Sequence, residues 1–187
     1  SVRIFVHSRC IFKGGKQLGI LSGNSKDEPL HDGEVFGAWS YMISNNGLLS
    51  IYQAFINHAG DKELKSMLEE AVRTMKDENQ SIGELLKENG IALPPALPDR
   101  PVASAEEIPV GARFMDPEIS GVLSINAAQG LVACSLVMGQ AIREDIALMF
   151  GQFHASKALF GAKLLRLNKE KAWLVPPPLH YAPTVAK

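Results

Sequence analysis

The chain has 187 residues, of which 46% are hydrophobic and 21% are charged, with a formal net charge of -1. This composition is typical of one globular domain with a real core, and the balanced charge offers no basic surface for nucleic acid. The two cysteines, Cys10 and Cys134, stand far apart and outside any Cys/His cluster. We therefore expect no disulfide framework and no zinc site, and a reducing, cytoplasmic compartment.

Residues 1–17 differ in character from the rest of the chain. Basic residues interrupt their short apolar runs, which is unlike a secretory signal. The codons of Lys13-Gly14-Gly15 can form a purine-rich run resembling a ribosome-binding site, and Leu18 can be read from an alternative start codon. We therefore expect 1–17 to be a leader or non-native extension, and 18–187 to be a single domain. N-terminal sequencing of the native protein tests this expectation.

Hydrophobic periodicity and helix breakers predict four helices, at about 32–58, 62–89, 116–140 and 143–171. Gly60 ends the first helix, and Asp61 is a natural N-cap for the second. Pro94 and Pro95 prevent the second from continuing. The apolar face predicted for the first helix consists of Val35, Trp39, Met42, Leu49, Tyr52 and Ile56.

The predicted third helix contains a long stretch without charge. It opens with an N-cap at Asp116 followed by Pro117, and no residue from Ile119 to Ile142 is charged. About 20 apolar residues would suffice to cross a bilayer, but serine, asparagine and glutamine side chains interrupt this stretch. We therefore expect no membrane span, and a helix that is buried on nearly all sides.

The two halves of the sequence resemble a repeat offset by 82 residues. Leu93-Pro94-Pro95 matches Val175-Pro176-Pro177. At the same offset, a row of residues along one face of a predicted helix matches a row on another. One offset therefore relates both the helices and the prolines that end them. The first row, called the Glu78 stripe below, consists of Leu64, Leu68, Ala71, Met75, Glu78, Ile82 and Leu85, and the second of Ile146, Phe150, Phe153, Lys157, Phe160, Leu164 and Leu167.

Connection lengths predict the topology. Short turns join the first helix to the second and the third to the fourth, so each pair forms an antiparallel hairpin. A proline-rich crossover of about 25 residues joins the hairpins, and at ~3.1 Å per residue it spans a helix of ~42 Å. The third helix can therefore run parallel to the second, as in a ferritin-like four-helix bundle.

Five segments of the sequence resemble a known family. From about residue 18 to residue 181, the chain is similar to the ferritin-like proteins of endospore-forming bacteria that form a domain-of-unknown-function family related to a spore coat protein. The resemblance implies a four-helix bundle and a location in the spore coat, and little about activity. It rests on LSGNSKDEPLHDGEVFGAW, LLKENGIALPPALPDRP, EEIPVGARFMDPEIS, QAIREDIALMFGQFHASK and AKLLRLNKEKAWLVPPPLH.

The metal ligands of a di-iron bundle are absent from the predicted helices. Such bundles carry one Glu on each of two helices and Glu-x-x-His on each of the other two. Glu78 is followed three residues later by Ser81, where the motif requires histidine. In the second half of the sequence, Phe160 occupies the position equivalent to Glu78. The alternative, a ferritin-like oxidoreductase or storage protein binding iron or another divalent metal, would need an atypical site near Glu78 and His154.

A buried ion pair is the other interpretation of Glu78. Lys157 lies on the fourth helix at a similar height, and an unpaired buried charge costs several kcal/mol. We expect a Glu78–Lys157 pair surrounded by amides in a structural polar core, with Asn46, Asn126 and Gln129 as the amide candidates. A pair of weak metal candidates, His31 and Glu34, shares one helix face, although helix capping explains them equally well.

The uncharged third helix also predicts an interface. Small residues along it would let another backbone approach closely, so we expect a homodimer formed through this helix. These residues are Gly121, Ala127, Ala128, Gly130, Ala133 and Gly139. The sequence therefore favours a non-catalytic structural or interaction protein without a cofactor, with the metalloprotein as the alternative.

Overall fold

The computed structural model describes residues 28–180, and all regular elements in that part of the chain are helical. The prediction of an all-α bundle is confirmed, with helix bounds within one residue of those expected. The prediction for residues 1–17 lies outside the described residues. The elements are α1 (Asp32–His58), α2 (Lys62–Glu88), the short 3-10 turns η2 (Ala105–Glu107) and η3 (Val110–Ala112), α3 (Asp116–Gln140) and α4 (Glu144–Glu170).

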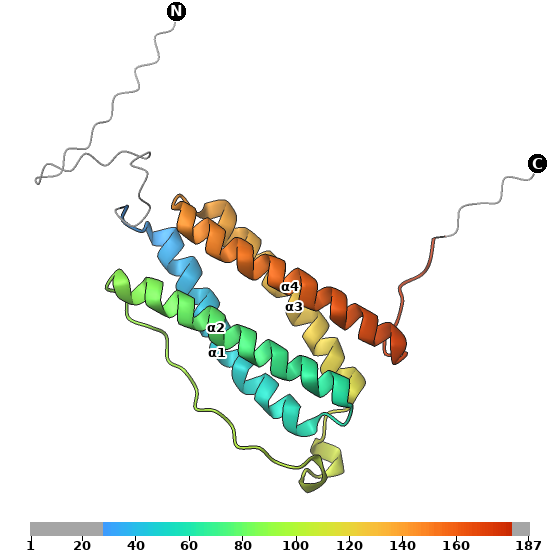
Figure 1. The fold of residues 1–187 in the computed structure, drawn as a ribbon. Helices are drawn as coiled ribbons and strands as arrows, with labels where there is room; N and C mark the ends of the chain where they lie inside the picture. Colours follow the sequence, from blue (N-terminus) through green and yellow to red (C-terminus); the bar gives the residue numbers. More distant parts are fainter. Residues whose placement is uncertain (1–27, 181–187) are drawn as a thin grey trace, which may run out of the picture.

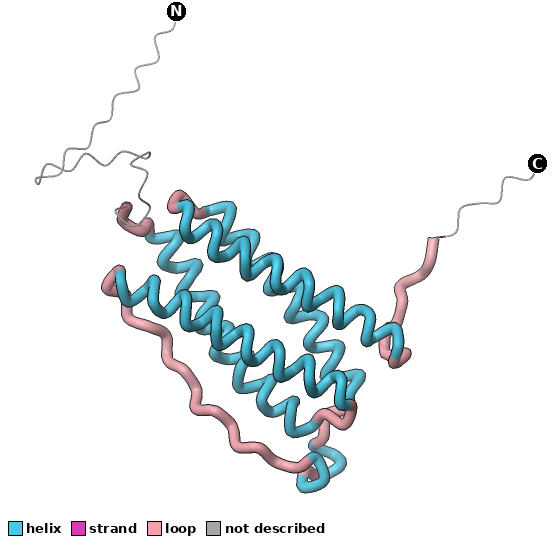
Figure 2. Tube along the Cα trace, in the orientation of Figure 1, coloured by secondary structure: helices cyan, strands magenta, loops and turns pink. Residues whose placement is uncertain are grey.

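The four helices form two antiparallel hairpins, α1/α2 and α3/α4, that lie against each other (Figure 1). Between the hairpins, α1 contacts α3 and α2 contacts α4, so α1 lies diagonally opposite α4. The crossover, residues 89–115, runs back beside the first hairpin and brings the chain to the end of the bundle where α2 began (Figure 2). As a result, α2 and α3 run in the same direction.

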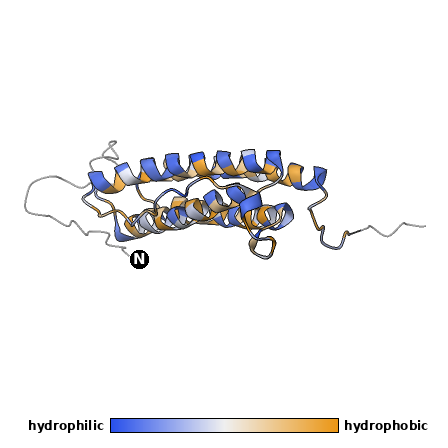
Figure 3. Ribbon diagram, turned by 90° about the horizontal axis from the view of Figure 1, so that it is seen from below, coloured by the Kyte–Doolittle hydropathy of each residue, from blue (hydrophilic) through white to orange (hydrophobic). Residues whose placement is uncertain are grey.

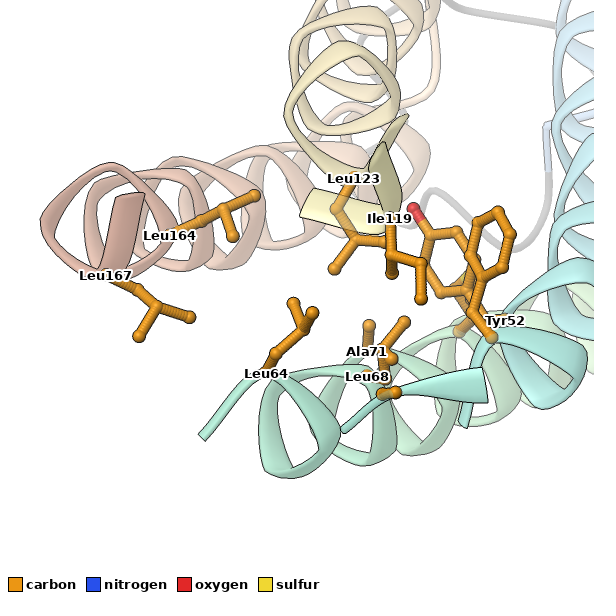
Figure 4. Packing of buried hydrophobic residues seen from close by; sticks show 11 residues of the cluster. Tyr52, Leu64, Leu68, Ala71, Ile119, Leu123, Leu164 and Leu167 are labelled. Atoms are coloured by element: carbon orange, nitrogen blue, oxygen red, sulfur yellow. The ribbon is translucent and has the colours of Figure 1, made fainter. Parts of the chain in front are cut away.

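The core consists of two apolar clusters, one toward each end of the bundle. All seven residues of the Glu78 stripe are buried, as expected. Figure 4 shows side chains of one cluster converging from all four helices, and Figure 3 shows hydrophobic residues where the helix layers face each other. The buried face of α1 matches the predicted one only at Met42 and Tyr52, and it also includes Ala38, Tyr41, Asn45 and Phe55. The difference arises because α1 packs against α2, α3 and the crossover together.

The internal repeat is confirmed by the helix ends. Three pairs of helix ends are 82 residues apart: 58 and 140, 62 and 144, and 88 and 170. The residues that follow α2 and α4 share a left-handed backbone, with φ of 73° at Gly90 and 56° at Ala172. The two hairpins therefore share one offset at these ends, whereas the starts of α1 and α3, at residues 32 and 116, differ by 84.

The repeat also produces a reciprocal pair of caps between the hairpins. Buried Glu34 of α1 accepts the backbone N–H groups of Ile142 and Arg143 in the α3–α4 turn, at 2.8 and 2.9 Å. At the same offset, Asp116 of α3 accepts those of Gly60 and Asp61 in the α1–α2 turn, at 2.9 and 3.0 Å. The prediction that Asp116 caps its own helix was wrong. It instead occupies the first helical position and caps the other hairpin.

The expectation that α3 is buried on nearly all sides was wrong, because within one chain much of its surface is exposed. Within the described residues one helical stretch, Val110–Gln140, is long and apolar enough to cross a membrane, judged by length and composition alone. Only 17% of its most apolar 18-residue segment is buried. α3 packs against α4 and α1 and leaves its third side open. Val132 is 70% exposed and Leu136 is 59% exposed.

Candidate functional site

The centre of the bundle contains the ion pair expected from the sequence. The Lys157 ammonium lies 2.9 and 3.0 Å from the two carboxylate oxygens of Glu78, which is 2% exposed. The Tyr41 hydroxyl and the Asn45 amide both donate to Oε2 of Glu78, at 3.0 and 3.1 Å. Four hydrogen bonds therefore satisfy this carboxylate, and they tie α1 and α4 to α2.

The path of Lys157 depends on a glycine of α3. A Cβ atom at Gly130 would lie 2.8 Å from Cδ and 3.1 Å from Cε of the lysine. The lysine side chain therefore passes close over Gly130, and a larger residue there would force its methylene groups to shift. Its ammonium also lies 5.5 Å from the centroid of the Tyr41 ring, within the range of a cation–π contact.

The remaining groups of this central cluster are uncharged at neutral pH. Burial, and then the nearby charge of Glu78, hold the pKa of the Tyr41 hydroxyl far above its usual range. Burial also raises the pKa of the Cys134 thiol, which donates to the Tyr41 oxygen at 3.5 Å. A reactive cysteine requires a lowered pKa, so the geometry disfavours a nucleophilic role for Cys134.

A cavity of about 430 Å³ lies beside the central cluster, between the hairpins. This volume lies within the range of small-molecule sites, and the lining is mostly apolar. Because the exposed side chains of Phe36 and Leu136 also line it, the cavity reaches the surface between α1 and α3. The inner wall includes Tyr41, Tyr52, Met75, Gly130, Lys157 and Phe160.

The amides proposed from the sequence lie elsewhere. Asn46 donates to the Pro95 carbonyl at 2.9 Å and accepts from Asn79 at 2.8 Å, so it anchors the crossover. Asn126 hydrogen-bonds Tyr52. Burial raises the pKa of the Tyr52 hydroxyl, and the hydrogen bond with Asn126 lowers it by a smaller amount. Gln129 is exposed on the cavity lining.

Sequence reasoning missed Tyr41, and of the two adjacent asparagines at this height it chose Asn46 and not Asn45. Neither Tyr41 nor Asn45 belongs to the predicted hydrophobic stripe, although Tyr52 of that stripe lies on the same buried side of α1. Tyr41 and Asn45 are four residues apart, so they share one side of the helix and reach the same carboxylate. This spacing, together with a central acid on the neighbouring helix, was the signal available in the sequence.

The weak metal candidates do not form one site, although His31 Nε2 lies 3.8 Å from Glu34 Oε2. His31 caps α1, where its Nδ1 accepts the Gly33 N–H at 3.0 Å, and Glu34 accepts the His31 N–H at 3.1 Å. His154 is half-buried on α4, one turn before Lys157. Within residues 28–180 no group of three or more His, Cys, Asp and Glu side chains is placed to hold a metal ion.

Comparisons with known proteins agree with this architecture. The family model of the proteins of unknown function called DUF3231 matches residues 18–185. The chain belongs to this family. The uncharacterized protein YvdQ of Bacillus subtilis strain 168 is 56% identical over 163 residues, covering 87% of this chain and 96% of YvdQ.

Two solved structures resemble this member of the DUF3231 family. A candidate spore coat protein of Bacillus halodurans C-125 is 58% identical and superposes with a TM-score of 0.84, covering 85% of this chain and all of that one. A conserved hypothetical protein of Mycobacterium tuberculosis gives a TM-score of 0.60 at 9% identity, covering 74% and 98% of the two chains. The second likeness concerns the fold alone.

Proposed function

We propose that this protein is a non-catalytic, ferritin-like structural bundle of the spore coat that assembles with a second copy of itself. The observation that carries the proposal is the central ion pair. Where a di-iron bundle places carboxylate ligands, Glu78 is neutralised by Lys157 and saturated with hydrogen bonds. A cation would have to displace an ammonium that already fits. The name of the Bacillus halodurans relative supports the coat location.

The open face of α1 and α3 supports assembly. Both helices present exposed apolar side chains there, and charged residues are absent from the exposed part of α3 beyond its first turn. Monomers rarely expose large contiguous apolar surfaces. A second copy would cover this face and the mouth of the cavity, and a two-fold pair of the same surface needs no other partner. The face consists of Phe36, Ile43, Ile51, Ile125, Val132 and Leu136.

A metal titration tests the non-catalytic part of the proposal. Protein purified without chelators is titrated with Fe²⁺, Mn²⁺ and Zn²⁺ in a calorimeter, beside a Glu78→Gln variant. We expect no heat that depends on Glu78, and no oxidation of Fe²⁺ above the buffer rate. Micromolar binding that is lost in Glu78→Gln would overturn the proposal and favour the metalloprotein.

Light scattering tests the assembly part separately. The full chain at micromolar concentration is expected to elute with twice the mass of 20.3 kDa. A monomer at that concentration would contradict self-assembly and leave the metal result unaffected.

A further inference from the structure

The crossover covers one face of α1 through a row of hydrogen bonds. Asn57 Nδ2 donates to the Pro101 carbonyl at 3.0 Å, and the Arg100 side chain donates to the Ser50 carbonyl at 2.9 Å. The spacing of the α1 partners places them on a single helical face. These partners are Trp39, Asn46, Ser50, Gln53 and Asn57.

The internal repeat identifies the matching face of α3, which is uncovered. Adding the offset of 82 to the five α1 positions gives five residues that are all exposed. They are small or apolar and lie on one helical face, called the α3/α4 groove below, where Ala128 and Val132 line a shallow hollow. The residues are Gly121, Ala128, Val132, Ser135 and Gly139.

The segment that follows α4 begins as a copy of the crossover. Trp173 packs against one core cluster as Ile91, 82 residues earlier, packs against the other. The sequence match continues, since WLVPPPLHYAP aligns with IALPPALPDRP and retains three prolines and one leucine in register. The two paths then differ: Leu93 packs against the core, whereas Val175 is 88% exposed and Leu179 is 64% exposed.

We propose that residues 175–180 dock in the α3/α4 groove of their own chain, as the crossover docks on α1. The segment leaves α4 beside the start of α3, where Asn168 donates to Ser124 at 3.2 Å. Seven residues of helix span about 10 Å, and three residues of extended chain span about the same length. The segment can therefore bring Pro177 to Ala128, as the crossover brings Pro95 to Asn46.

The chemistry of segment and groove is complementary. The segment is apolar and proline-rich, and the groove lacks the amide side chains that hold the crossover on α1. Its small residues instead let the backbone of an extended chain approach closely. Prolines keep such a segment extended and reduce the entropy lost on docking. The groove shares Val132 with the α1/α3 face assigned to the second copy, and its other four residues lie outside that face.

Engineered disulfides test the proposal on the full chain with Cys10→Ser and Cys134→Ala. The test pair is Ala128→Cys with Pro177→Cys. The positive control is Asn46→Cys with Pro95→Cys, a pair in contact. The negative control is Arg73→Cys with Pro177→Cys, because Arg73 is exposed on α2.

We expect the 128/177 pair to close within one chain about as fast as 46/95. It should exceed 73/177 by about tenfold or more, because docking raises the effective concentration above that of a free tether. Reaction is followed on non-reducing gels and by peptide mass. Closure no faster than 73/177, or closure only between chains, would overturn the proposal.

Discussion

At the scale of single residues, the centre of this bundle is organised around one carboxylate. Glu78 is almost completely buried, so its charge requires an opposite charge and donors on every lone pair. Lys157, Tyr41 and Asn45 supply these from two neighbouring helices. The exposed pair of Lys163 and Glu70, at 2.7 Å, joins the same two helices, α2 and α4, but in water. The two pairs therefore allow a direct comparison.

Replacing Lys157 with Met should destabilise the protein by about 3–5 kcal/mol, because it leaves a buried carboxylate without its cation. Adding Glu78→Gln should recover most of the loss, since a glutamine oxygen still accepts from Tyr41 and Asn45. Urea unfolding of the single and double variants measures this coupling. Lys163→Met is the matched control and should cost less than about 1 kcal/mol. Equal effects of the two lysine substitutions would contradict the assignment.

Gly130→Ala should destabilise the protein by about 1–3 kcal/mol, because the added methyl collides with the Lys157 side chain. Alanine normally stabilises an exposed helical position by about 1 kcal/mol relative to glycine. Gly47→Ala in α1 tests that rule, since a Cβ atom added at Gly47 would meet nothing within 4 Å. Opposite signs for the two substitutions in thermal unfolding are the expected result, and a stabilising Gly130→Ala would contradict the tight path for the lysine.

At the scale of helices and turns, the hairpins are joined by groups near their ends as well as by their cores. Each hairpin turn receives a carboxylate from the first helix of the other hairpin, Glu34 in one case and Asp116 in the other. Turn N–H groups and helix N-termini favour negative charge, so these caps are electrostatically matched. Lys171, at the end of α4, adds a link by binding Asp61 in the α1–α2 turn and Glu63 of α2.

Glu34→Gln should lower the free energy of unfolding by about 1–3 kcal/mol, because a neutral amide oxygen replaces the carboxylate that accepts buried N–H groups. Glu144→Gln is the control, since Glu144 lies exposed in the first turn of α4 and should change stability by no more than about 0.5 kcal/mol. Urea unfolding monitored by circular dichroism measures both. A Glu34→Gln variant as stable as the control would show that the cap contributes little.

The acid dependence of stability should weaken when Lys171 is replaced by Met. The hydrogen bond from Lys171 is the main cause that lowers the pKa of Asp61. A carboxyl with a lowered folded-state pKa adds stability above its unfolded pKa of about 3.9, and that stability is lost as pH falls through the folded value. The difference in urea midpoint between wild type and Lys171→Met should therefore be constant above about pH 5 and shrink below about pH 4. A difference that grows with acid would contradict this linkage.

At the scale of the whole molecule, the two hairpins are copies that have diverged in what covers them. The crossover covers α1, whereas α3 keeps an open apolar side. The α2 position of Glu78 is matched on α4 by Phe160, so the repeat carries one central acid and not two. The asymmetry gives the molecule one polar centre and one open apolar face.

Leu136→Arg should shift the protein toward the monomer, because it places a charge in the face assigned to the second copy. Leu159→Arg is the control, since Leu159 is 68% exposed on α4 while Leu136 is 59% exposed beside the cavity mouth. Sedimentation velocity over a concentration series measures both. Dissociation by Leu159→Arg alone would place the interface on the outer side of α4.

The sequence by itself determined the helices, their order and the repeat, because these depend on local periodicity, prolines and one offset. It also determined that Glu78 faces the core, since the Glu78 stripe packs on one side. Tertiary structure decided which groups satisfy that acid. The α1 face turns toward α2, α3 and the crossover at once, so Tyr41 and Asn45 lie inside and Asn46 lies under the crossover. It also decided that Gly130 makes room for Lys157 and that Asp116 caps the other hairpin, because such contacts join residues with no local relation in the chain.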